Sequence, residues 1–194
     1  MSRNERYRRL QMSFRGESLT GGVPVTLLVT KLKAAQEVLF HAAAAVSDRP
    51  VARKGQWSNR YRKFVELTFG KAHHSDLVIE LDAARDEEYL SPEFQVTDKA
   101  FDLFFDVGNC IQNDMRGIET LDLRRDDRTY LLRAFEGLLP GVDDEYRIEI
   151  ENCSREQHPK LDLSSGGRSS VRKFLAREVV PASADEAIVV GELV

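Results

Sequence analysis

The chain has 194 residues, of which 42% are hydrophobic and 31% charged, and its formal net charge at pH 7 is −4. A chain of this length can bury one sizeable core, and this composition is typical of a soluble globular protein. No apolar run approaches the roughly 18 residues that a membrane-spanning helix needs, so we expect no membrane partner.

The residues at the N-terminus and the number of cysteines bear on the cellular compartment of the protein. The first residues are charged and lack the apolar core of a secretion signal, and the chain contains only Cys110 and Cys153. We therefore expect a cytoplasmic protein with free thiols. A disulfide between the two cysteines is the alternative.

The first predicted elements are a strand over residues 6–19 and a long helix over residues 24–47. Leu10, Met12 and Phe14 alternate along the strand and are expected to face the core. Apolar residues then recur with the spacing of one helix face, and we expect this helix to be buried along most of its length between strands. The residues on that face are Val25, Leu28, Val29, Leu32, Ala35, Leu39, Ala43 and Val46.

The remaining elements complete an α+β pattern. Residues 64–69 and 76–81 predict a hairpin, residues 97–113 and 127–139 predict helices, and Gly108 indicates close contact with another backbone. Strands are expected at 145–150 and 160–163, a helix at 168–178 and a strand at 187–194. This order favours a mainly antiparallel sheet with helices packed on one face. We expect one domain over residues 1–180, followed at 181–194 by a linker and a strand that could open a truncated second domain.

A glycine-rich segment, residues 164–170, is the first candidate site. Gly166 and Gly167 lie between a predicted strand and a predicted helix, where free backbone N–H groups can bind an anion. Arg168 and Arg172 would add positive charge. The segment lacks the spacing of a nucleotide-binding loop, and an ordinary turn with a serine cap is the alternative.

A basic loop, residues 49–63, is the second candidate. It contains six basic residues and no acidic one. Cations that neutralise phosphates beside aromatic rings that stack on bases are typical of single-stranded nucleic-acid binders. The alternative is a solvated connection, or one that meets the acidic stretch 82–93 within the fold or across a homodimer. The candidate binding residues are Arg53, Lys54, Trp57, Arg60, Tyr61 and Arg62.

Two weaker motifs contain residue types suited to metal binding or to nucleophilic catalysis. His73, His74 and Asp76 have suitable ligand types for a metal, but adjacent histidines in an extended segment point apart. Cys153 and His158 are close in sequence, yet a cysteine nucleophile needs a base held beside it in three dimensions. We assign no catalytic residue, no metal ligand and no cofactor.

Two short patterns resemble an uncharacterised family of bacterial proteins. The first is Phe14-x-Gly16-Glu17-Ser18-Leu19 followed by Val23-Pro24-Val25 and a helix with Gln36-Glu37; the second is residues 189–194. In that family an N-terminal α+β domain precedes a small β-rich domain. The resemblance implies a multi-domain parent and no known activity.

The sequence therefore favours a non-enzymatic protein-interaction or regulatory module of a bacterial cytoplasmic protein. Its partner would be another protein or its own missing C-terminal domain. The alternative is phosphate-directed binding of nucleic acid or nucleotide through residues 49–63 and 164–170.

Overall fold

The computed structural model describes residues 7–19, 22–47, 65–73, 78–84, 96–154, 157 and 159–179. The basic loop 49–63 and the predicted strand at 187–194 lie outside these ranges. The elements are β1 (Tyr7–Arg15), the 3₁₀ turn η2 (Glu17–Leu19), α1 (Val25–Val46), β2 (Leu67–His73), β3 (Val78–Ala84), α3 (Val96–Gln112), α4 (Arg125–Leu138), β4 (Arg147–Asn152), β5 (Lys160–Leu163) and α5 (Ser165–Val179).

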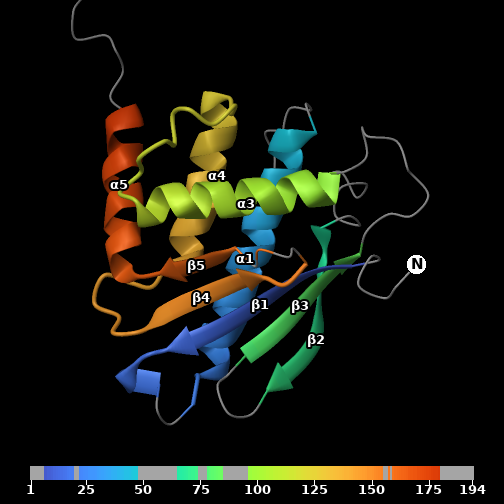
Figure 1. Cartoon of the computed structure of the whole chain (residues 1–194). Helices are drawn as coiled ribbons and strands as arrows, with labels where there is room; N and C mark the ends of the chain where they lie inside the picture. The colour runs from blue at the N-terminus through green and yellow to red at the C-terminus, as the bar shows by residue number, and fades with distance from the viewer. Residues whose placement is uncertain are drawn as a thin grey trace, which may run out of the picture.

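The described strands form one five-stranded sheet in the order β2-β3-β1-β4-β5, and every neighbouring pair is antiparallel. The predicted hairpin is β2–β3, although both strands lie a few residues later than expected. The first predicted strand is the central one, β1. The predicted α+β class, with helices packed against a mainly antiparallel sheet, is confirmed (Figure 1).

One face of the sheet is apolar because side chains alternate along each strand. Leu10, Met12 and Phe14 of β1 are all buried. Met12 pairs with Ile150 and Phe14 with Ile148, so the apolar residues of neighbouring strands share this face. Figure 1 shows α1 passing behind the strands, where it covers them. The other face carries the polar residues.

The helices pack against one another as well as against the sheet. Helix α1 contacts α3 and α4, which differs from the expectation that strands would cover it on both sides. Phe104 of α3 and Phe135 of α4 pack against each other in the core with ring centroids 5.2 Å apart and ring planes tilted by 44°. Gly108 of α3 makes room for the Leu161 side chain, because a Cβ there would lie 2.4 Å from its Cδ1. The close contact at Gly108 is therefore with a side chain and not with backbone.

The expected long buried helix is confirmed, with one difference at its start. Ala35, Val38 and Leu39 are completely buried, but Val25 is 73% and Val29 is 42% exposed. A second difference concerns α5, which begins at Ser165 and not at Arg168. Gly166 and Gly167 are thus part of the helix and not of a turn before it.

Candidate functional site

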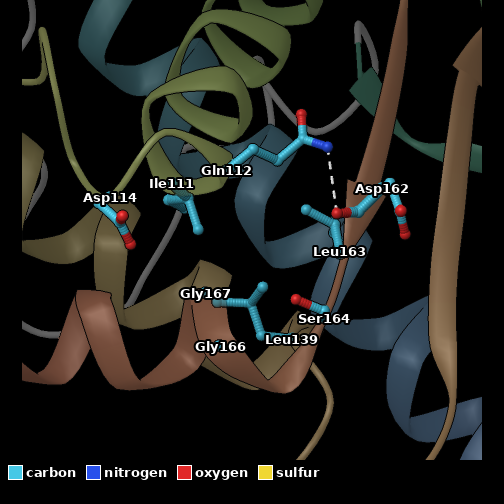
Figure 2. Close-up of a pocket in the computed structure, with 9 residues that line it drawn as sticks. All are labelled: Ile111, Gln112, Asp114, Leu139, Asp162, Leu163, Ser164, Gly166 and Gly167. Atoms are coloured by element: carbon cyan, nitrogen blue, oxygen red, sulfur yellow. Dashed lines mark hydrogen bonds between the residues drawn. The ribbon is translucent and has the colours of Figure 1, made fainter.

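The start of α5 borders a cavity of about 320 Å³ (Figure 2). It lies where β5 ends and α5 begins, beneath the C-terminal end of α3. The residues that line it are Ile111, Gln112, Asp114, Leu139, Asp162, Leu163, Ser164, Gly166 and Gly167. The structure therefore places the two predicted glycines at a cavity.

The two glycines have different physical roles. A Cβ on Gly167 would lie 2.9 Å from Ile111 Cγ2 and 3.1 Å from Leu139 Cδ2, whereas Gly166 is exposed and has only Ser164 Oγ within 4 Å. Both neighbours of Gly167 belong to the core. Packing of α5 against the core is thus sufficient to explain a glycine at 167.

The two predicted arginines of α5 are directed to α4 and do not line the cavity. Arg172 Nε lies 2.6 Å from Glu136 Oε1, and Arg168 Nε lies 3.8 Å from the same oxygen. Arg168 also donates a hydrogen bond to the Leu139 carbonyl oxygen. These contacts hold α5 against the C-terminal turn of α4.

The charge at the cavity is negative. Asp114 and Asp162 lie on opposite sides of it, and neither arginine nor lysine lines it (Figure 2). Asp114 has a φ of 53° and accepts a hydrogen bond from Ser170 Oγ, and Gln112 donates to the Asp162 carbonyl oxygen. The Asp162 carboxylate points away from the cavity and pairs with Arg147, so Asp114 is the acidic side chain that opposes the binding of an anion there (Figure 2). No cationic side chain lines the cavity, and phosphate binding at residues 164–170 stays a prediction.

The other predicted motifs are only partly described. Arg53, Lys54, Trp57, Arg60, Tyr61 and Arg62 lie outside the described residues, as do His74, Asp76 and His158. Cys110 and Cys153 are free thiols, and burial raises the pKa of Cys110. Over the described residues, no group of three His, Cys, Asp or Glu side chains is close enough to hold a metal ion.

A buried lysine at the end of α4 is a feature that the sequence analysis missed. Lys31 is 4% exposed and donates hydrogen bonds to the carbonyl oxygens of Gly137 (3.1 Å) and Leu139 (2.7 Å). Burial and the charge of Arg168 lower its pKa to about 8, against the opposing effect of Asp144. Carbonyl groups at a helix C-terminus have no partner within the helix and favour a cation. Lys31 is therefore a helix cap that joins α1 to α4.

The exposed start of α1 is the second feature that was missed. Val25 and Val29 lie one turn apart on the same side of the helix, and both belong to the small set of large apolar residues that are exposed in the described structure. Leu32, at the next turn, is partly buried against the core. We call Val25 and Val29 the α1 apolar stripe. Periodicity could not reveal it, because the spacing of a helix face does not show which turns are covered.

Searches with protein-family models, curated proteins and solved structures find no match to this chain. No described helix has the length and apolar character needed to cross a membrane.

Proposed function

We propose that this chain is a non-enzymatic protein-interaction module of a bacterial cytoplasmic protein, and that the α1 apolar stripe is its contact surface. The observation that carries the proposal is the exposure of Val25 and Val29 at the start of a helix whose apolar side chains are buried or partly buried further along. A helix that presents apolar residues one turn apart is a common recognition element, because it fits an apolar groove on a partner.

The surroundings of the stripe support a contact role. Thr26 and Thr30 flank it and are exposed, so a polar rim borders the apolar residues. Interfaces of this kind have an apolar centre and a polar edge. The helix is anchored from Lys31 onward by α4, which holds the stripe rigidly without covering it. The preferred partner is a separate protein with an apolar groove.

Site-specific photo-crosslinking in a bacterial lysate tests this proposal. A crosslinking amino acid is placed at 25 or 29, and, as the matched control, at the exposed Lys173 of α5. We expect the same adduct from positions 25 and 29 and none from 173. Excess wild-type chain should abolish the adduct, whereas excess chain carrying Val25→Asp and Val29→Glu should not.

The outcome also identifies the kind of partner. An adduct of twice the chain mass would assign a second copy of this chain as the partner. Equal labelling from all three positions, or competition by the variant chain as strong as by the wild type, would contradict the proposal. The two acidic substitutions leave the fold intact because they lie in the first turns of α1, where the helix dipole favours negative charge.

The alternative of nucleic-acid or nucleotide binding stays a prediction that rests on residues 49–63 and 164–170. Of its candidate residues in the described structure, Arg168 and Arg172 contact Glu136. Fluorescence anisotropy with labelled single-stranded DNA and RNA at low salt tests it. Absence of binding, or binding unchanged by Arg53→Ala with Arg60→Ala, would reject it.

A further inference from the structure

The polar face of the sheet contains a second cavity, of about 420 Å³. Gln11, Ser13 and Arg15 of β1 lie on this face, opposite the face formed by Leu10, Met12 and Phe14. Ser13 pairs in register with Glu149 of β4. The volume is within the range of small-molecule sites in proteins.

A largely buried serine lies at the floor of this cavity. Ser13 is 7% exposed, its side chain lines the cavity, and no residue in the described ranges hydrogen-bonds to its Oγ. The Ser13 Oγ is not one of the described side-chain atoms that are both shut off from solvent and without a partner, so it keeps contact with the space of the cavity. The Ser13 hydroxyl is thus available to a molecule that enters the cavity.

The walls combine both signs of charge. Arg15 Nη2 lies 3.0 Å from Glu149 Oε2, and Lys160 Nζ lies 2.8 Å from Glu151 Oε2. Arg15 and Glu149 are 64% and 40% exposed at their side chains. Exposed ion pairs contribute little to stability, so a ligand can replace one partner at small cost. Each cation here has a carboxylate as its neighbour.

The composition of the walls selects the ligand class. A simple anion would meet Glu149, Glu151 and the Asp162 carboxylate, and a simple cation would meet Arg15 and Lys160. Ile150 and Leu161 also line the cavity, but the charged side chains are contributed by Arg15, Glu149, Glu151, Lys160 and Asp162. A small zwitterion satisfies both signs of charge at once, because each of its charges replaces one partner of an existing ion pair.

We propose that this cavity binds a polar α-amino acid, inserted between Arg15 and Glu149. The ligand carboxylate takes the place of Glu149 on Arg15 and accepts a hydrogen bond from Ser13 Oγ. The ligand ammonium group takes the place of Arg15 on Glu149. This site lies apart from the α1 apolar stripe and does not depend on the proposed protein interaction.

Nuclear magnetic resonance titration of the ¹⁵N-labelled chain with the protein α-amino acids, added one at a time, tests this proposal. We expect saturable shifts at residues 11–15 and 149–151 for at least one polar amino acid. The N-acetyl derivative of that amino acid, which lacks the positive charge, and its amide, which lacks the negative charge, should each bind at least about tenfold more weakly.

Three variants test which side chains contribute to the affinity for the amino acid. Arg15→Gln should weaken binding by about tenfold or more, and Ser13→Ala by about fivefold, because each removes a donor to the carboxylate. Arg147→Gln is the matched control, since Arg147 is on the same face and pairs with Asp162 at 3.1 Å but does not line the cavity. Its affinity should stay within about twofold of the wild type. No saturable shift with any amino acid, or equal affinity of all three variants, would overturn the proposal.

Discussion

At the scale of single residues, Gln36 shows how one side chain can complete a sheet edge. Its Nε2 donates to the Val65 carbonyl oxygen at 2.8 Å, and its Oε1 accepts from the Leu67 backbone N–H at 2.6 Å. Among the described strands, β2 is at the edge of the sheet, and Val65 lies just before its first residue. The amide of Gln36 pairs with these two backbone groups as a neighbouring strand would, and it fastens α1 to the start of β2.

Replacing Gln36 with Leu should lower the free energy of unfolding by about 1–3 kcal/mol, because two backbone groups lose their partner. Urea denaturation followed by circular dichroism measures this change. Glu37→Ala at the exposed neighbouring position is the control and should change stability by less than about 0.5 kcal/mol. Equal stability of the two variants would show that the Gln36 hydrogen bonds do not contribute.

At the scale of secondary-structure elements, the two glycines in the first turn of α5 should respond differently to replacement by alanine. Gly167→Ala should destabilise the protein by about 1–3 kcal/mol, since its new methyl group would overlap Ile111 and Leu139. At Gly166 a Cβ would make only an ordinary contact with Ser164 Oγ at 3.7 Å, so Gly166→Ala in this helix should stabilise the protein by about 0.5–1 kcal/mol. Thermal unfolding of both variants measures the difference. Equal effects at the two positions would contradict the close contact of α5 with α3.

The contact between α1 and α4 should make stability depend on pH. His41 of α1 stacks on Tyr130 of α4 with ring centroids 5.8 Å apart, and burial lowers the pKa of His41 to about 4 although Asp127 opposes this. The unfolded chain binds a proton at the ordinary histidine pKa of about 6.5. The unfolded state therefore holds more protons between pH 6.5 and 4, and folding stability falls as the pH decreases through this window.

Urea denaturation at a series of pH values tests this dependence. The loss attributable to His41 should be on the order of 2 kcal/mol between pH 6.5 and 4. Carboxylate groups titrate near the lower end of the same range, so the wild type must be compared with His41→Gln, which cannot titrate. The variant should lose less stability over this window. Parallel pH profiles of the two proteins would exclude His41 as the cause.

At the scale of the whole molecule, the sequence predicted the elements and the fold class well because local patterns determine both. Buried and more exposed residues alternate along β4, and buried apolar residues recur with helical spacing along α1. Each pattern arises because one face of the element is buried. The short strand at 160–163 has the predicted bounds, and the helix at 25–46 begins and ends within a residue of the prediction. The start of α5 was misplaced because glycines usually interrupt helices, whereas here packing against Ile111 requires one.

The features that could carry function were harder to predict because they depend on tertiary placement. Arg168 and Arg172 looked available in the sequence, but both contact Glu136 of another helix. Val25 shares its spacing with buried residues and is exposed because α1 extends past the elements that cover it. Ser13 became notable only when β1 and β4 were paired, since the register brings Glu149 beside it.

The contact role of the α1 apolar stripe is tested most directly by a binding isotherm with the crosslinked partner, once it is identified and purified. Isothermal titration calorimetry should give saturable binding to the wild-type chain and at least about tenfold weaker binding to the Val25→Asp/Val29→Glu chain, because the apolar contact is lost. Circular dichroism of both chains confirms that each is folded. Equal affinity of the two folded chains would contradict the assignment of this surface.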